Sequence, residues 1–265
     1  MKNYGGYEDS PVLAELYDLV PAYIQRADID FYRRQCSAIS GRILELGCGT
    51  GRILLNVAEG GSTITGLDVS GNMLERCRLK LENLPGETRQ RVRLVHASMI
   101  DFDLDGTFDL AIIPFRAFQH IVNTEDQLSC LNRIAEHLSP GGKLIFDVFH
   151  VDPQRINNPD HLIESEDCPE MELPDGRRMR RCNRIVAFNP AEQYNDVELI
   201  YYLTDIHGTT DRIIQSFAMR YFSRYETEHL LARCGFEVEN LYGDFDESPL
   251  QAESPEMIFL ARKLS

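Results

Sequence analysis

The chain has 265 residues and a mass of 30.3 kDa. With 43% hydrophobic and 26% charged residues it can bury a sizeable core, which excludes an extensively disordered protein. Its formal net charge of −15 disfavours binding to the phosphate backbone of a nucleic acid. No run approaches the roughly 18 apolar residues of a membrane helix, and the seven cysteines form no Cys-x-x-Cys pair. We therefore expect free thiols in a reducing cytoplasm, no metal site and no membrane anchor.

Strands and helices alternate through the first part of the chain. Residues 8–39 predict two short helices, and Gly41 ends that pattern. The next five apolar segments read as strands: Arg42–Leu46, Thr63–Leu67, Val92–Val95, Phe108–Ile113 and Lys143–Phe149. Ser70 is expected to cap the helix after the second strand, and Thr124 to open the helix before the fifth. This alternation is typical of parallel βαβ units with right-handed crossovers.

The pattern changes near residue 151. Residues 153–175 are polar, acidic and interrupted by prolines. Three runs then show period-two alternation and predict antiparallel strands: 184–188, 196–206 and 212–222. A helix over 226–234 and strands over 236–242 and 257–261 complete the chain. The sequence therefore predicts a parallel α/β core with an antiparallel insertion between its fifth strand and its last helix.

A glycine-rich turn follows the first expected strand and opens a helix. It reads Glu45-Leu46-Gly47-Cys48-Gly49-Thr50-Gly51 and stands where open α/β sheets bind ligands. The dinucleotide fingerprint G-x-G-x-x-G would need its third glycine one residue later, where this chain has Arg52. The lysine of a P-loop is absent too. A Rossmann-type NAD oxidoreductase is therefore the weaker alternative.

The spacing Glu-x-Gly-x-Gly-x-Gly resembles motif I of the class I S-adenosylmethionine (AdoMet)-dependent methyltransferases. Asp68 at the end of the second strand and Pro140-Gly141-Gly142 before the fifth extend the resemblance. It covers roughly residues 41–149 and 223–263. It implies an α/β fold with a Rossmann-like, doubly wound, mostly parallel seven-stranded sheet and an antiparallel lid after strand five. AdoMet is then the cofactor and S-adenosylhomocysteine the product.

This resemblance divides the chain into four expected segments. They are an N-terminal helical cap (1–40), the AdoMet-binding core (41–150), the lid insertion (151–222) and a C-terminal completion of the core (223–265).

Chemistry supports the expected cofactor site. Glycines lack Cβ and permit close backbone approach, and the Asp68 carboxylate can accept hydrogen bonds from two ribose hydroxyls. A carboxylate at Glu45 suits the cationic sulfonium and ammonium. Where the family often has an Asp at the adenine, this chain has Ser98-Met99: the Ser98 hydroxyl, or the Met99 amide and side chain, would read the ring. The full expected set is Tyr17, Tyr32, Glu45, Gly47, Gly49, Gly51, Asp68, Ser98, Met99 and Phe115. For the two tyrosines, ordinary core packing is an equal alternative.

The segment after strand four, 114–121, faces the methyl group in this family. DNA amino-methyltransferases carry Asn/Asp-Pro-Pro-Tyr/Phe there, whereas this chain has Ile112-Ile113-Pro114-Phe115. The chain is more similar to small-molecule N-methyltransferases, including those of amino sugars, which share Tyr17-Asp18 and the lid. His120-Ile121 matches their His/Tyr-Leu pair, with Gln119 in place of Gly. His120 is the candidate general base, titrating near pH 7; the alternative is a structural histidine.

These expectations combine into one function with two alternatives. We expect methyl transfer from AdoMet by in-line displacement to a small-molecule acceptor, at nitrogen rather than oxygen. A non-catalytic AdoMet-binding module is the second possibility, since Gln119 and Ser98 depart from the family pattern. We expect no nucleic-acid partner and a monomer or homodimer. The arginines of 177–184 are expected to pair with the acidic residues before them rather than capture an anion, and Asp244 to lie in a solvated loop rather than at the acceptor.

Overall fold

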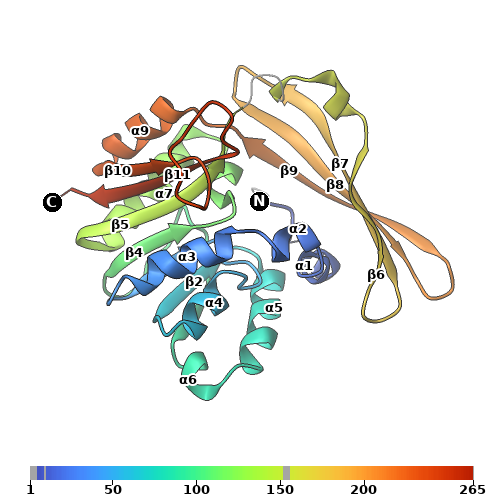
Figure 1. The fold of residues 1–265 in the computed structure, drawn as a ribbon, viewed down its shortest axis with the longest axis horizontal. Helices are drawn as coiled ribbons and strands as arrows, with labels where there is room; N and C mark the ends of the chain where they lie inside the picture. Colours follow the sequence, from blue (N-terminus) through green and yellow to red (C-terminus); the bar gives the residue numbers. More distant parts are fainter. Residues whose placement is uncertain (1–4, 9, 152–155, 265) are drawn as a thin grey trace.

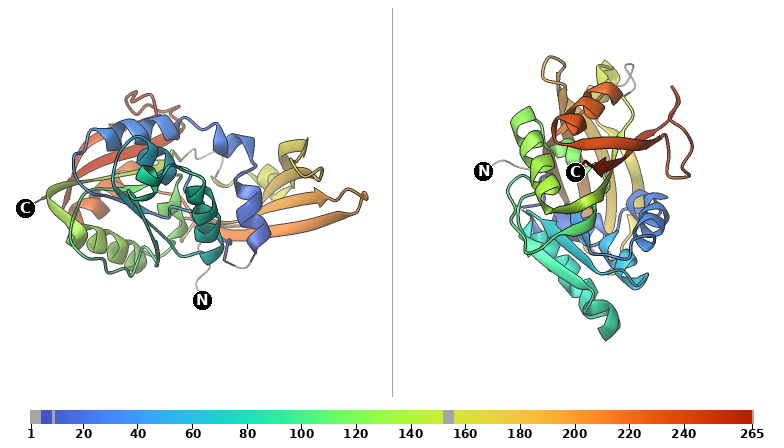
Figure 2. Two further views of the ribbon diagram at one scale, coloured as in Figure 1. Left: turned by 90° about the horizontal axis from the view of Figure 1, so that it is seen from below. Right: turned by 90° about the vertical axis from the view of Figure 1, so that its left-hand side faces the viewer.

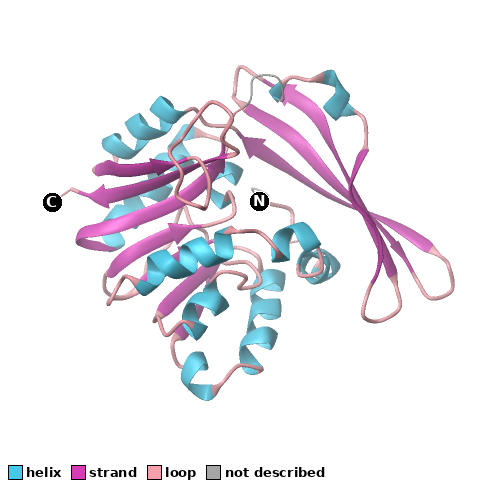
Figure 3. Ribbon diagram, in the orientation of Figure 1, coloured by secondary structure: helices cyan, strands magenta, loops and turns pink. Residues whose placement is uncertain are grey.

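The computed structural model describes residues 5–8, 10–151 and 156–264. Two separate sheets frame the molecule, one of seven strands and one of four (Figures 1 and 3). The seven strands are β1 (Ile43–Leu46), β2 (Ile64–Asp68), β3 (Val92–His96), β4 (Phe108–Ile113), β5 (Leu138–Phe149), β10 (Phe236–Tyr242) and β11 (Glu256–Lys263). The prediction of seven strands is confirmed. The strand predicted to begin at Lys143 begins at Leu138, because Leu138 already pairs with Phe108 of β4 before the register shifts across the Pro-Gly-Gly turn to Lys143 opposite Leu110.

The strand order fixes where a ligand binds. The order is β10-β11-β5-β4-β1-β2-β3, and only β11 runs antiparallel to its neighbours. The chain moves outward from β1 to β3 and then returns to place β4 on the other side of β1. The carboxyl ends of β1 and β4 therefore meet where the winding reverses, which is the usual ligand site of such sheets. The predicted doubly wound, mostly parallel sheet is confirmed.

Helices cover both faces of this sheet (Figures 1 and 2). Side chains of β4 alternate: Leu110 and Ile112 pack in the cluster of α3, α4 and α5, while Ala111 and Ile113 pack in that of α7 and α9. Burial on both faces explains why these strands are almost continuously apolar. The helices are α3 (Asp28–Ser37), α4 (Leu54–Glu59), α5 (Gly71–Glu82), α6 (Gly86–Arg89), α7 (Thr124–His137) and α9 (Arg224–Arg233).

The N-terminal part has three helices and not two. Before α3, the chain forms α1 (Pro11–Tyr17) and α2 (Pro21–Ile24), each with its proline in the first turn. Proline has no N–H and a fixed φ, so it starts helices readily and does not continue them. The first helix, which the apolar spacing extends to Val20, therefore ends at Tyr17, and a separate short helix begins at Pro21.

The second sheet lies between β5 and α9 in the chain, as predicted. We call it the lid sheet; its strands are β6 (Ser165–Glu172), β7 (Arg178–Asn189), β8 (Tyr194–Thr204) and β9 (Thr210–Arg220), in that order and all antiparallel. The period-two pattern does not predict β6, whose run is acidic and contains Pro169, although its acidic residues were expected to pair with the arginines of 177–184. An edge strand tolerates a proline, and the pairing shifts register there, between Cys168 and Met171. The four-segment division stays a prediction.

Candidate active site

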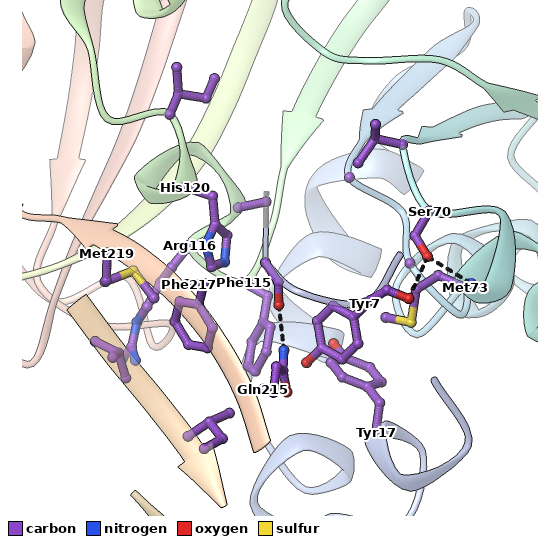
Figure 4. Close-up of a pocket in the computed structure, with 18 of the residues that line it drawn as sticks. Tyr7, Tyr17, Ser70, Met73, Phe115, Arg116, His120, Gln215, Phe217 and Met219 are labelled. Carbon is purple, nitrogen blue, oxygen red and sulfur yellow. Dashed lines mark hydrogen bonds between the residues drawn. The ribbon is translucent and has the colours of Figure 1, made fainter. Parts of the chain in front are cut away.

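A cavity of about 480 Å³ lies at the carboxyl ends of β1, β2 and β4. Loops of the core sheet, the N-terminal segment and the inward face of the lid sheet enclose it (Figure 4). Eight of the predicted site residues line it: Tyr17, Gly47, Gly49, Asp68, Ser98, Met99, Phe115 and His120. Tyr32, Glu45 and Gly51 do not line it. Asp244, in the loop after β10, does not line it either.

The glycine loop presents bare backbone to the cavity. Gly47 and Gly49 have φ of +72° and +54°, and the N–H groups of Gly47 and Cys48 donate to the Leu67 carbonyl at 2.8 and 2.9 Å. A Cβ on Gly47 would come within 3.0 Å of the Ala117 Cβ, and one on Gly49 within 3.2 Å of the Met73 methyl. Glycine is therefore required at both positions.

The Asp68 carboxylate is held by backbone N–H groups on both sides. Gly49 N–H donates to its Oδ2 and Ser70 N–H to its Oδ1, both at 2.8 Å. Each carboxylate oxygen keeps a further lone pair for an incoming hydroxyl. Burial raises the pKa of Asp68 to about 6, although these two hydrogen bonds oppose the rise. A half-buried carboxylate with lone pairs still available, beside a loop of bare backbone, fits the ribose of AdoMet.

Two predicted contacts lie away from the cavity surface, and we correct their roles. A Cβ on Gly51 would come within 2.6 Å of the Cys77 sulfur and 3.0 Å of Leu55, so this glycine lets the loop pack on α4 and α5. Glu45 is 2% exposed, and burial raises the pKa of its carboxyl well above its usual range. Its Oε2 has no hydrogen-bond partner among the described residues. Glu45 therefore does not contact a ligand in the cavity, and any electrostatic attraction to a cation there acts over a distance.

The turn after β4 holds two adjacent residues in the left-handed region. Phe115 and Arg116 have φ of 58° and 62°, which costs side-chain-bearing residues about 1–3 kcal/mol each. The turn brings the Phe115 ring to the cavity, with the Tyr23 ring 4.9 Å away and the guanidinium of Arg52 4.6 Å away. Strain of this kind persists only where the surroundings enforce it.

A buried polar network enforces that turn. Phe115 N–H and the Tyr32 hydroxyl donate to the same oxygen, Oδ1 of Asp147, at 2.9 and 2.7 Å. Arg26 donates to Oδ2 of Asp147 and to Glu256, and Arg116 pairs with Glu256 as well. Tyr32 is completely buried in this network. Its expected role as a cofactor contact is therefore corrected: it supports the turn that carries Phe115.

His120 lies at the cavity wall, on the 3₁₀ turn η1 (Ala117–His120). Its ring packs edge-on against Phe217 of the lid, with centroids 5.1 Å apart. Its buried Nδ1 has no hydrogen-bond partner among the described residues. Burial lowers the pKa of His120 to about 4, with the Ala218 backbone opposing the shift. The expectation of titration near pH 7 is thus not met, and the ring is neutral at pH 7.

Ser98 and Met99 line the cavity after β3. The Ser98 hydroxyl accepts a long hydrogen bond of 3.4 Å from Ile100 N–H, so it keeps capacity for a second partner. The Met99 methyl stands close to Gly47 of the glycine loop. Both predicted ways of holding adenine, through Ser98 or through Met99, are compatible with these positions.

The inward face of the lid sheet is ordered in cross-strand rows. One row is Asn183–Leu199–Gln215, the next is Ile185–Val197–Phe217, and a third pairs Asn195 with Met219. Side chains of one parity share one face of a sheet. The cavity is therefore bounded on the lid side by an apolar band with amides on either side of it.

The arginine run pairs with the acidic residues before it at Arg178, Arg180 and Arg181, as predicted, whereas Arg177 and Arg184 have acidic partners outside that stretch. The facing pairs are Arg178–Glu170 (2.8 Å), Arg180–Glu166 (3.6 Å), Arg181–Asp167 (3.0 Å) and Arg184–Glu198 (2.8 Å), while Arg177 pairs with Asp175 and Glu15. These contacts confirm pairing within the sheet, since every arginine of the run has an acidic partner.

Gln119 explains one departure from the family pattern. This fully buried side chain donates to the Arg220 carbonyl and accepts from Phe149 N–H at 2.9 Å. It thereby joins the last residues of β5 and β9, where the lid sheet enters and leaves the core. A glycine there would make neither contact.

Gly5 and Tyr7 of the N-terminal segment also line the cavity, and neither was among the predicted site residues. The Gly5 carbonyl accepts from Gln215 of the lid, and the Tyr7 carbonyl accepts from Ser70 of the core at 3.2 Å (Figure 4). The Tyr7 carbonyl also accepts from Asn72 at 3.3 Å. This segment therefore bridges lid and core. The sequence pattern could have identified Gln215, because it is a polar residue at an inward position of the alternating run in β9.

By its similarity to known methyltransferases the chain is an AdoMet-dependent methyltransferase, and AdoMet is its cofactor. Residues 43–142 match the family model described as a methyltransferase domain. The predicted resemblance is confirmed, and the NAD oxidoreductase alternative is set aside. No helix among the described residues is both long and apolar enough to cross a membrane.

Known relatives agree with this class. The chain is 25% identical over 263 residues to the cypemycin N-terminal methyltransferase of Streptomyces sp, covering 97% of each chain. It is 28% identical over 141 residues to the dTDP-3-amino-3,6-dideoxy-alpha-D-glucopyranose N,N-dimethyltransferase of Streptomyces fradiae, covering 51% of this chain and 52% of that one. Among solved structures, the CcbJ methyltransferase from Streptomyces caelestis has the same fold, with a TM-score of 0.77, 20% identity and coverage of 99% and 100%.

Proposed function

We propose that this enzyme methylates a nitrogen atom of a small molecule by in-line displacement. The observation that carries this proposal is the neutral His120 ring on the acceptor side of the cofactor cavity. An amine attacks only in its neutral form, so its site has to favour an uncharged, hydrogen-bonded nitrogen. A neutral imidazole offers one acceptor nitrogen to such an N–H group.

In this proposal different residues of the chain bind the cofactor, shape the cavity and exclude water. Gly47, Gly49 and Asp68 hold the cofactor, which when bound supplies a methyl group activated by a sulfonium. The Phe115 turn fixes the wall between the cofactor and acceptor sides. The lid and the N-terminal segment exclude water. Alignment of nucleophile and methyl in a dry site accounts for most of the rate in such transfers.

His120 orients the acceptor in this proposal and does not store its proton. A base whose pKa is about 4 competes poorly for the proton of an alkylammonium ion. His120 is instead suited to accept a hydrogen bond from the amine and so direct the nitrogen lone pair at the methyl group. This replaces the general-base role expected from the sequence.

One relative supports nitrogen as the acceptor atom, since it is named an N,N-dimethyltransferase. The net charge of −15 supports a small molecule over a nucleic acid. The alternative of a non-catalytic AdoMet-binding module rested on two departures from the family pattern, Gln119 and Ser98. The buried hydrogen bonds of Gln119 explain the first of these departures by structure alone. A cytoplasmic location and a monomeric or homodimeric state stay predictions.

Methyl transfer to matched acceptors tests this proposal. The protein is incubated with AdoMet and either benzylamine or benzyl alcohol, and S-adenosylhomocysteine and methylated product are measured by mass spectrometry. We expect N-methylbenzylamine as the product and no ether. Ether formation without amine methylation would contradict the proposal.

A further inference from the structure

Gln215 presents an unpaired carbonyl oxygen in the cavity wall. Its Nε2 donates to the Gly5 carbonyl, and because a carbonyl can only accept, this contact fixes the orientation of the amide. Its Oε1 is then left buried, with no hydrogen-bond partner among the residues that the structure describes. Burying an acceptor without a donor is costly, so this oxygen points to a donor that a ligand supplies.

His120 lies on the same side of the cavity. Gln215 and Phe217 share one face of β9, and the His120 ring packs against Phe217. Gly5 links the two from the other side: it accepts from Gln215, and a Cβ on it would lie 3.9 Å from His120 Cε1. Both side chains line the cavity (Figure 4). Two uncharged hydrogen-bond acceptors therefore lie on the same side of the cavity, with Gly5 and Phe217 as shared neighbours.

We propose that Gln215 Oε1 and the His120 ring accept the N–H groups of the acceptor amine, so that the site selects primary and secondary amines. This inference rests on the proposed function and adds the substrate class to it. The nitrogen lone pair forms the new N–C bond as the C–S bond breaks with its electron pair on sulfur, and the surplus proton leaves to water. Each transfer replaces one N–H, so a dimethylated amine has none left in its neutral form. Methylation therefore stops at the tertiary amine.

The aromatic rings of the cavity offer a competing explanation. Tyr7 and Tyr23 each contact Tyr17, with ring centroids 5.7 and 5.0 Å apart. Aromatic cages of this kind bind quaternary ammonium through cation–π attraction. Recognition by the rings alone predicts that affinity is kept or rises as methyl groups are added, whereas recognition by Gln215 and His120 predicts that it falls.

A calorimetric series separates these two explanations. Protein saturated with S-adenosylhomocysteine is titrated at pH 7 with benzylamine and its N-methyl, N,N-dimethyl and N,N,N-trimethyl derivatives. We expect the dissociation constant to rise about three- to tenfold for each hydrogen bond lost. Constant or increasing affinity along the series, or no binding by benzylamine, would overturn the proposal.

Variants assign the effect to Gln215. Gln215→Met removes the amide at similar size, and we expect it to abolish the preference for benzylamine over the trimethyl compound. Gln215→Glu keeps an acceptor oxygen and should retain the preference. Gln251→Met, the same change in the exposed loop between β10 and β11, is the matched control. Unchanged affinity for S-adenosylhomocysteine shows that a variant is folded. A wild-type preference in Gln215→Met would overturn the inference.

The results that would refute the proposed function differ from those that would refute the role of Gln215. Methyl transfer to benzyl alcohol alone would refute nitrogen as the acceptor atom, whichever of the amines binds most tightly. Transfer to benzylamine with an unchanged preference in Gln215→Met would keep the proposed function and refute the role of Gln215.

Discussion

The backbone N–H of Phe115 donates to Oδ1 of Asp147 over 2.9 Å, and this contact ties the cavity wall to the neighbouring strand. Asp147 lies on β5, and the strained turn that carries Phe115 follows β4. The Tyr32 hydroxyl reaches the same oxygen from α3. The shape of the site therefore depends on a residue that does not touch it.

Tyr32→Phe tests this division of roles. The variant removes one hydrogen bond to a buried carboxylate but leaves the one from Phe115. We expect the free energy of unfolding to fall by about 1–3 kcal/mol, and the dissociation constant of S-adenosylhomocysteine to stay within about twofold. Denaturant unfolding and calorimetry measure the two quantities. A tenfold loss of affinity with unchanged stability would restore Tyr32 as a cofactor contact.

Gln119→Gly restores the residue that the similar N-methyltransferases carry. It removes two buried hydrogen bonds, to Phe149 and to Arg220, and adds backbone freedom. We expect a loss of about 2–3 kcal/mol in the free energy of unfolding. Gln251→Gly, at an exposed position, should change stability by less than about 0.5 kcal/mol. Equal effects of the two variants would disprove the link between lid and core.

Two arginines of the run are predicted to differ strongly in their contribution. Arg178 is half exposed in its pair with Glu170, whereas Arg181 is 4% exposed, pairs with Asp167 and donates to the Tyr23 hydroxyl at 2.6 Å. We expect Arg178→Ala to cost at most about 1 kcal/mol, and Arg181→Ala about 1.5–3 kcal/mol because it removes the charged hydrogen bonds that the buried guanidinium makes to Asp167 and to the Tyr23 hydroxyl. Thermal or chemical unfolding measures both. Similar costs would refute the assignment.

The low pKa of His120 predicts a pH dependence of stability. The folded value is about 4 and the usual value 6.5, so between them the unfolded chain binds more protons. Stability is therefore full above pH 6.5 and is lost as pH falls towards 4, by about 3 kcal/mol from this group. In His120→Asn this part of the pH dependence should disappear. An unchanged stability profile would show that the ring titrates normally.

Much of the fold was predictable because its signals are local. Glycine spacing, the acidic residue at the end of β2 and the apolar strand runs each depend on a few neighbouring residues, and the fold and the cofactor class that they indicated are confirmed. The edge strand β6 has no apolar alternation, because its pairing with β7 decides its structure; only the expected charge pairing with the arginines of 177–184 pointed to it.

The acceptor side was less predictable because distant segments build it. Gly5, His120 and Gln215 meet only when the N-terminal segment crosses from core to lid. Burial also changed chemistry that composition implied: His120 and Glu45 sit in environments that move their pKa values far from the usual range. Tyr32 shows the same limit, since Asp147, its partner, lies 115 residues away.

A titration with S-adenosylhomocysteine, with NAD as the control, tests the central claim most directly. At ~100 times its dissociation constant the ligand should stabilise the protein by about 2.7 kcal/mol, which is several degrees in a thermal-shift assay. We predict a saturable shift with S-adenosylhomocysteine alone, lost in Asp68→Ala because the variant cannot accept from the ribose hydroxyls. A shift with NAD instead, or full affinity in Asp68→Ala, would contradict the account of this site.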